Sequence, residues 1–199
     1  KEIIESVSIR TLDTLAQSFL YRPLGMNSTL FNPPFEMVNQ IVPTEIDSIF
    51  RKRLLQGEVH DENAHILGGV SGHAGIFSTA SDIGKYGQML LNDGIWKGRR
   101  IFKNKQVKNF TELHYLPIDS ERTLGWDTPS RNGKSSAGDY FSISTFGHLG
   151  YTGTSLWIDP ENEIIVVLLT NRVHPTRERG GIYGMRRDFH SEVMKILLN

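Results

Sequence analysis

Three short segments combine residue types whose spacing could serve chemistry. The first, residues 146–154, holds His148 between Gly147 and Gly150 at the start of a predicted apolar hairpin. A histidine can hold or transfer a proton near neutral pH, and a glycine in a strand marks a place where another group approaches the backbone. That group is either a substrate or a packed neighbour, and a single histidine in such a place is more often structural.

The second segment, residues 59–65, places His60 and His65 around two carboxylates and an amide. The histidines are five positions apart, so they would not share one face of a helix, and the pattern is not the His-Glu-x-x-His of zinc proteases. We therefore favour a hydrogen-bonded loop that holds the local fold together. We predict no metal and no cofactor.

The third segment, residues 68–75, contains four glycines, which permit positive φ angles and close backbone approach. It lacks the Gly-Lys-Ser/Thr ending of a phosphate-binding loop. Ser71 does not fit the Gly-x-Ser-x-Gly nucleophile turn either, because residue 73 is histidine. A tight turn leading into a helix is favoured over a direct catalytic role.

Composition narrows the range of partners. Lysine plus arginine and aspartate plus glutamate number 22 each, so there is no net field to attract nucleic acid. There are no cysteines, which excludes disulfides and thiolate chemistry. No apolar run approaches the roughly 20 residues of a membrane span. The chain opens with Lys1-Glu2-Ile3-Ile4, without an initiator methionine, and the spacing of Ile3, Ile4 and Val7 predicts a helix that begins at once. This pattern suggests a fragment.

The first half of the chain reads as helices joined by loops. A helix is predicted to begin near Thr11 and to stop at Pro23 and Gly25. Residues 27–43 are rich in proline and are predicted to form a loop. Ser81 is a candidate N-cap for a helix that ends before Gly94, and residues 104–111 have room for a short helix.

The last third reads as a sheet with a covering helix. Residues 154–158 and 164–170 are predicted to form an antiparallel hairpin around the turn residues 159–162, with another strand near 141–148. Residues 164–169 are apolar on both faces, which predicts a central strand. Apolar residues at steps of three and four predict a helix over 182–197. The fold class is therefore α+β, an antiparallel sheet covered by helices.

Together these segments resemble the β-lactamase-like serine hydrolases, which include class C β-lactamases, penicillin-binding-protein-like D-alanyl-D-alanine peptidases and esterases. The resemblance covers nearly the whole chain in order. The matching stretches are Tyr21-Arg22-Pro23-Leu24-Gly25-Met26, Gly72-His73-Ala74-Gly75-Ile76-Phe77-Ser78-Thr79-Ala80-Ser81-Asp82-Ile83 and Gly147-His148-Leu149-Gly150-Tyr151-Thr152-Gly153. Val59-His60-Asp61-Glu62-Asn63-Ala64 and Leu169-Thr170-Asn171-Arg172-Val173-His174-Pro175 are similar to a bacterial subgroup whose hydrolase domain is often fused behind a β-N-acetylglucosaminidase.

The resemblance implies acyl transfer through a serine ester, with Ser-x-x-Lys and Tyr-x-Asn motifs supplying the nucleophile and proton-transfer groups. Neither motif occurs in this chain: Ser71, Ser81 and Ser130, for example, are followed three residues later by Ala74, Gly84 and Gly133. In the family both motifs lie upstream of the Pro-Leu-Gly-Met stretch. We therefore expect residues 1–199 to be a single incomplete β-lactamase-like domain, the C-terminal part of the fold, inactive as it stands.

The third family element, Lys-Thr-Gly or His-x-Gly on a strand beside the serine, is matched by His148-Leu149-Gly150. The resemblance implies catalytic roles for His148, Gly150 and the backbone N–H of Tyr151, an oxyanion donor. Leu149 departs from the family's threonine or serine and cannot donate a hydrogen bond, which favours an esterase or another peptidase. The predicted substrate-binding residues are Leu149, His73, Arg172, Arg177 and Arg179; a solvated basic loop is an equal alternative for the arginines.

The leading interpretation is thus a piece of a bacterial serine acyl hydrolase that works outside the cytoplasm, in the periplasm or cell envelope. Its substrate would be a small ester or a cell-wall (peptidoglycan-derived) molecule. A non-catalytic module that binds cell wall or a partner is the alternative, and an artificial or proteolytic fragment is a third. Removing the family's N-terminal strands would leave an open sheet edge, so we expect the fragment to self-associate.

Overall fold

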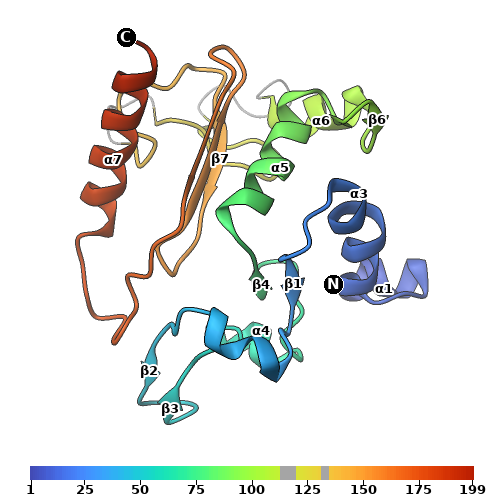
Figure 1. Cartoon of the computed structure of the whole chain (residues 1–199), viewed down its shortest axis with the longest axis vertical. Coiled ribbons are helices and arrows are strands. Elements are labelled where there is room, and N and C mark those ends of the chain that lie inside the picture. The colour runs from blue at the N-terminus through green and yellow to red at the C-terminus, as the bar shows by residue number, and fades with distance from the viewer. Residues whose placement is uncertain (113–119, 131–134) are drawn as a thin grey trace. The chain divides into compact units, whose positions relative to one another are not determined.

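The computed structural model describes residues 1–112, 120–130 and 135–199, and its architecture is α+β as predicted (Figure 1). Helical elements are α1 (Glu2–Ser8), α2 (Leu12–Ala16), the π-helical turn η1 (Gln17–Tyr21), α3 (Arg22–Leu24), the 3₁₀ helix η2 (Phe35–Gln40), α4 (Glu62–Ile66), α5 (Ala80–Leu91), α6 (Asn104–Thr111) and α7 (Ile182–Leu197). Strands are β1 (Leu30–Phe31), β2 (Ile46–Asp47), β3 (Arg53–Leu54), β4 (Ile76–Phe77), β5 (Ile95–Trp96), β6 (Arg99–Arg100), β7 (Phe146–Leu149), β8 (Ser155–Asp159) and β9 (Ile164–Leu168).

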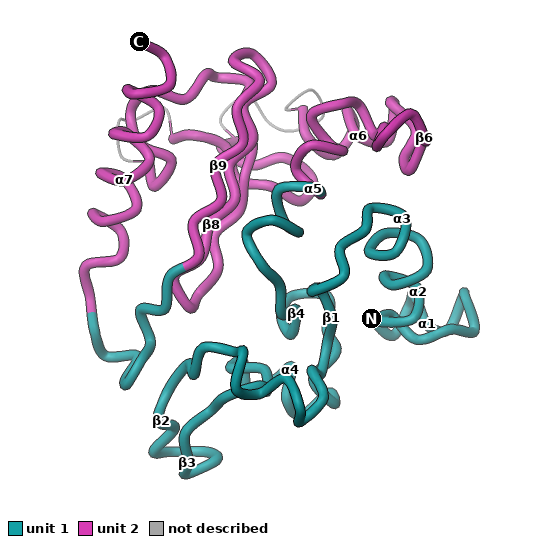
Figure 2. Tube along the Cα trace, viewed as in Figure 1, with its two compact units in different colours: residues 1–85, 170–179 teal, residues 86–169, 180–199 magenta. Residues whose placement is uncertain are grey.

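The described residues form two compact units (Figure 2). Unit 1 comprises residues 1–85 and 170–179, and unit 2 comprises residues 86–169 and 180–199. The boundary falls inside α5. Unit 1 holds short helices and the two-stranded sheets β1–β4 and β2–β3, whereas unit 2 holds the three-stranded sheet and α7.

The helix predicted from Thr11 begins there, with Thr11 in an extended conformation as its N-cap. Pro23 does not stop it, contrary to the prediction. The helix is continuous through Pro23, which follows the π-helical turn η1 and Arg22, and the chain stays helical to Leu24. Gly25 ends it in the left-handed region with φ 67°. The segment 27–43, predicted as loop, also contains β1 and η2.

The start of α5 is fixed by Thr79 and not by the predicted Ser81. The Oγ1 of Thr79 accepts a hydrogen bond from the N–H of Asp82 at 3.3 Å. Asp82 is buried and accepts from the N–H of Ser28 at 2.7 Å and from the Oγ1 of Thr29 at 3.0 Å. Burial raises the pKa of Asp82, but these bonds and Lys85 lower it more, so the carboxylate ties α5 to the chain after α3.

The sheet of unit 2 is antiparallel and has the order β7-β8-β9. The predicted hairpin and the helices over 104–111 and 182–197 are confirmed. The predicted first strand is shorter than expected: β7 starts at Phe146, and Ser142 instead bonds the Asp159 carboxylate through its N–H at 2.9 Å. Here Ser142 and Asp159 fold the preceding residues into a turn.

The prediction that residues 164–169 form a central strand was wrong for the described strands, because β9 pairs only with β8. An apolar pattern on both sides of a strand indicates that both faces of the sheet are covered. It does not indicate how many strands pair with that strand. On one face, Ser155 and Trp157 contact His190 of α7. On the other face, Gly87 in the second half of α5 lies against Ile165, and a Cβ on Gly87 would be 3.0 Å from the Cγ2 of Ile165.

Candidate active site

His148 stands near the end of β7, at one edge of the sheet. It pairs with Leu156 of β8 and its side chain is exposed. Its Nδ1 lies 2.9 Å from the carbonyl oxygen of Leu149. The site predicted from His148-Leu149-Gly150 is therefore a solvent-accessible imidazole on a rigid strand.

The glycine that precedes His148 makes room for a packed neighbour. A Cβ on Gly147 would lie 2.3 Å from the carbonyl oxygen of Leu156 and 2.3 Å from the ring of Trp157. Trp157 is 2% exposed and belongs to the core. The outer edge of β7 is paired at this residue, since Gly147 and Asp127 exchange backbone hydrogen bonds of 2.9 and 2.8 Å.

Gly150 is fixed in the turn between β7 and β8. Its N–H donates to the carbonyl of Thr154 at 2.7 Å, and a Cβ here would lie 2.1 Å from the Thr154 Oγ1. The buried Arg186 donates from Nη2 to the carbonyls of both residues at 2.6 Å. Tyr151, the predicted oxyanion donor, follows in the same turn with an exposed side chain. The turn is thus held from the interior by an arginine.

Leu149 points to the opposite face of the sheet from His148, because side chains alternate along a strand. A pocket of about 210 Å³ opens on that face of unit 2. Its lining includes Leu149, Trp157, Tyr183, Ser135, Ser136 and Glu121. Arg122, Asp127, Thr128 and Ser130 complete the lining, so hydroxyls and charged groups outnumber the apolar side chains of Leu149 and Trp157. Such a lining suits a small polar molecule.

The three predicted arginines lie in unit 1, in the loop that follows β9. Arg172 donates from Nη1 to the carbonyls of Arg177 and Arg179 at 3.3 and 3.4 Å, and Arg179 is exposed. The guanidinium of Arg177 already binds two carboxylates. Its Nη2 lies 2.6 Å from Glu45 Oε2 and 2.7 Å from Glu62 Oε1.

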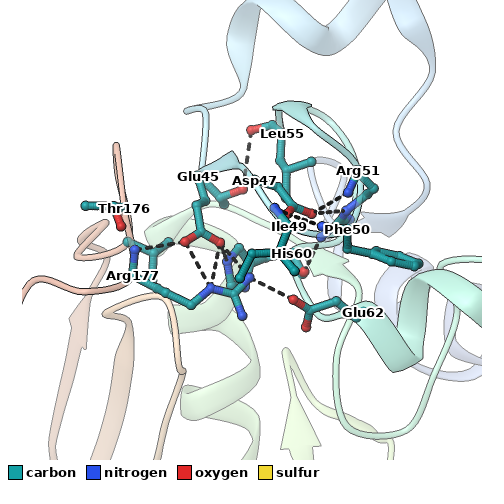
Figure 3. Close-up of polar contacts among 12 residues, drawn as sticks. Glu45, Asp47, Ile49, Phe50, Arg51, Leu55, His60, Glu62, Thr176 and Arg177 are labelled. Atoms are coloured by element: carbon teal, nitrogen blue, oxygen red, sulfur yellow. Dashed lines mark hydrogen bonds and ion pairs between the residues drawn. The ribbon is translucent and has the colours of Figure 1, made fainter.

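Glu45, His60, Glu62 and Arg177 form one ionic cluster, which we call the Glu45 cluster (Figure 3). Glu45 is buried and also accepts from the N–H of Arg177 at 2.8 Å and lies 2.8 Å from His60 Nε2. Burial raises the pKa of Glu45, but the bonds from Arg177 and His60 outweigh it and hold the pKa at about 2. The pKa of Arg177 is raised, and the largest cause is its hydrogen bond to the Glu45 carboxylate.

A second buried carboxylate, Asp47, organises the neighbouring turn (Figure 3). It accepts from the N–H groups of Ile49, Phe50 and Arg51 and from the Arg51 Nε at 3.1 Å. Burial raises the pKa of Asp47, and these bonds lower it further than burial raises it. The hydrogen bonds predicted within residues 59–65 are present at His60, Asp61 and Glu62. The segment is not a loop throughout, contrary to the prediction, because Asp61 caps the helix α4, which begins at Glu62.

His73 is part of a chain of three polar side chains. Its Nδ1 lies 2.8 Å from Ser71 Oγ, and its Nε2 lies 2.9 Å from Asp61 Oδ1. Sequence reasoning noticed His73 and Ser71 but missed Asp61 and Glu45. Asp61 is 12 positions from His73, and Glu45 is 132 positions from Arg177. No local periodicity links residues at such separations.

The structure places the predicted residues in three segments. His148, Leu149, Gly150 and Tyr151 lie together in unit 2, and the three arginines share one loop of unit 1. His73 also belongs to unit 1 but lies in a different loop. Their predicted roles in catalysis and substrate binding remain predictions.

Comparison with known proteins gives the class. The β-lactamase family model matches residues 1–188, so the chain belongs to the β-lactamase family. A Salmonella typhi protein named "Putative D-alanyl-D-alanine carboxypeptidase" is 39% identical over 189 residues, covering 86% of this chain and 43% of that protein. A Salmonella agona protein of the same name matches with the same identity and coverage. The chain therefore spans less than half the length of these relatives.

Solved structures agree on the fold. A β-lactamase from Mycobacterium bovis is similar with a TM-score of 0.65 at 17% identity, covering 99% of this chain and 59% of that one. Simvastatin synthase from Aspergillus terreus gives a TM-score of 0.69 at 14% identity, covering 98% and 53%. A penicillin-binding protein homologue from Caulobacter crescentus gives a TM-score of 0.60 at 16% identity, covering 85% of this chain and 49% of that one.

No helix in the described part of the chain is long and apolar enough to cross a membrane.

Proposed function

We propose that the protein containing these residues is a serine acyl hydrolase that acts on an ester or a peptidoglycan-derived substrate in the bacterial periplasm or cell envelope. The observation that carries the proposal is the exposed His148 at the end of β7, backed by the rigid turn at Gly150. Family membership adds the nucleophilic serine, and the relatives are longer than the part that this chain matches, 43% of the Salmonella typhi protein. Residues 1–199 alone lack Ser-x-x-Lys.

In this proposal the chain supplies the walls and polar groups around the acyl carbon. His148 shares a proton with the attacking or leaving oxygen, and the Tyr151 N–H meets the oxyanion. Leu149 offers no hydroxyl, so a substrate that needs one there binds weakly. That favours esters over β-lactams. In unit 1, Arg172 and Arg179 are proposed carboxylate-binding residues on the strength of their charge, while Arg177 binds Glu45 and Glu62 and orders their loop.

Acylation of the longer protein tests this proposal. With the upstream region included, labelled penicillin and a fluorophosphonate should each be tried and the intact mass read. We expect an adduct on an upstream Ser-x-x-Lys serine, faster with the fluorophosphonate. His148→Ala should slow it by about 100-fold or more. His174→Ala is the matched control. Like His148 this histidine is exposed, but it lies in a loop, and its replacement should leave the rate unchanged. A folded protein without an upstream adduct would favour the non-catalytic binding module.

We also propose that the 199-residue chain associates with itself through β9. Among the described strands β9 pairs on one side only, and its apolar residues Ile164–Leu168 offer a strand edge with no charge to oppose pairing. An upstream glycoside hydrolase domain remains a further proposed partner of the longer protein.

Light scattering over a range of concentrations checks the self-association. We expect a dimer or larger species, and Leu169→Lys, at a position 45% exposed just after β9, should shift it toward monomer. Ile196→Lys, at a position on α7 that is 72% exposed, is the control and should leave the association unchanged. A monomer at all concentrations would contradict the proposal.

A further inference from the structure

Ser71, His73 and Asp61 are joined by two consecutive hydrogen bonds in unit 1. The serine Oγ lies 2.8 Å from one ring nitrogen of His73, and the other ring nitrogen lies 2.9 Å from Asp61 Oδ1. A hydroxyl, an imidazole and a carboxylate in this order are what nucleophilic catalysis by serine requires. The imidazole accepts the hydroxyl proton, and the carboxylate fixes its tautomer and stabilises the imidazolium.

Asp61 is held in place independently of His73. It is the N-cap of α4, and its Oδ1 also accepts the N–H of Ala64 at 2.7 Å. Burial raises the pKa of Asp61, but the bonds from Ala64 and His73 lower it more, so the group is ionised at neutral pH. The carboxylate is therefore a fixed negative charge on which the imidazole can be oriented.

The same chain contains a serine–histidine pair that lacks this arrangement. Ser155 Oγ lies 3.1 Å from His190 Nε2, but the other ring nitrogen lies 2.7 Å from the backbone carbonyl of Ser136. His190 is fully buried and burial lowers its pKa. The side chain of His73, in contrast, is 53% exposed. Of these two serine–histidine pairs, the Ser71 pair is the one that joins a carboxylate to a histidine that solvent reaches.

We propose that Ser71 is a second nucleophile, which hydrolyses small activated esters with His73 as general base and Asp61 as its positioning residue. Ser71 Oγ attacks the ester carbonyl carbon while its proton passes to His73 Nδ1. The bond to the leaving alcohol then breaks, and His73 returns the proton to that oxygen. Water attacks the acyl-serine by the same proton path and releases the carboxylic acid, which restores the Ser71 hydroxyl.

The geometry also limits the substrate. Ser71 is 6% exposed, so we expect small acyl groups such as acetyl to react faster than bulky ones. The backbone N–H of Gly72, the residue after the nucleophile, is the proposed oxyanion donor. This activity belongs to the 199 residues themselves and does not depend on the upstream serine of the proposed function.

The test treats the 199-residue chain with diisopropyl fluorophosphate and, separately, with p-nitrophenyl acetate. We expect one phosphoryl adduct, mapped to Ser71 by peptide mass, and slow release of nitrophenolate. Ser71→Ala should lose both, and His73→Ala should lower both rates by about 100-fold or more. Ser155→Ala is the matched control, a serine beside a histidine without a carboxylate, and should change neither.

Asp61→Asn separates orientation from folding, because asparagine also caps a helix. We expect a lower kcat for p-nitrophenyl acetate with an unchanged KM, since the carboxylate that orients His73 is gone while the ester still binds. A merely structural Asp61 would leave kcat in place in the folded variant. Three results would overturn the proposal: no adduct on the folded chain, an adduct that persists in Ser71→Ala, or equal labelling rates with and without His73.

Discussion

Replacing Arg177 with methionine is expected to lower the free energy of unfolding by about 3 kcal/mol, the lower end of the cost of breaking a buried ion pair. Methionine fills similar space but leaves the buried Glu45 carboxylate with His60 as its remaining side-chain partner in the Glu45 cluster. The Arg177 side chain is 27% exposed, which keeps the loss from being larger. Chemical denaturation at pH 7 measures it.

The loss should depend on pH in a defined direction. The pKa of Glu45 falls from 4.5 to about 2 on folding, with burial opposing and the Arg177 bonds driving the shift. Between these values the unfolded state binds more protons, so stability rises with pH. The contribution is complete above pH 4.5 and is lost as pH falls toward 2. In Arg177→Met the stability curve should be flatter across that window.

Two controls distinguish the effect of breaking the buried Glu45 cluster from the effect of removing one positive charge. Arg53 pairs with Glu58 at the surface and its side chain is 57% exposed, so Arg53→Met should cost at most about 1 kcal/mol. The double variant Glu45→Gln/Arg177→Met removes both charges and should recover part of the loss. If Arg53→Met and Arg177→Met cost the same, the buried cluster has no special role.

Replacing Gly147 with alanine is expected to destabilise the chain by about 2–3 kcal/mol, the upper range for overpacking. The added Cβ would meet the carbonyl oxygen of Leu156 and the Trp157 ring at 2.3 Å each. Neither can move easily, since one is backbone in β8 and the other is core. Thermal unfolding followed by tryptophan fluorescence reports both the midpoint and the packing of Trp157.

Gly184→Ala is the matched control for the same chemical change. Gly184 lies in α7, where a new Cβ would meet nothing within 4 Å. Alanine there should stabilise by roughly 0.5–1 kcal/mol, because it restricts the unfolded chain and favours a helix. A destabilised Gly184→Ala, or a neutral Gly147→Ala, would show that the strand's glycine has another purpose than making room for Trp157.

The elements with strong local periodicity followed from the sequence. The helices over 104–111 and 182–197 and the hairpin of β8 and β9 form where predicted, because apolar spacing and turn residues act over a few neighbours. The family followed as well, since several short motifs stand in order along the chain. His148 was selected for the same reason, because it lies in a short motif along the chain, and its catalytic role remains a prediction.

The tertiary structure decided what depends on residues far apart in the chain. The place of β9 at the edge of the sheet, the partner of Gly147 and the capture of Arg177 by Glu45 all join distant segments. Asp61 lies at the start of α4, and His73 lies in the glycine-rich segment that follows this helix. The two side chains meet only because that segment folds back toward the start of α4. Local spacing determines which helix or strand forms, whereas the packing of the whole chain determines which side chains meet.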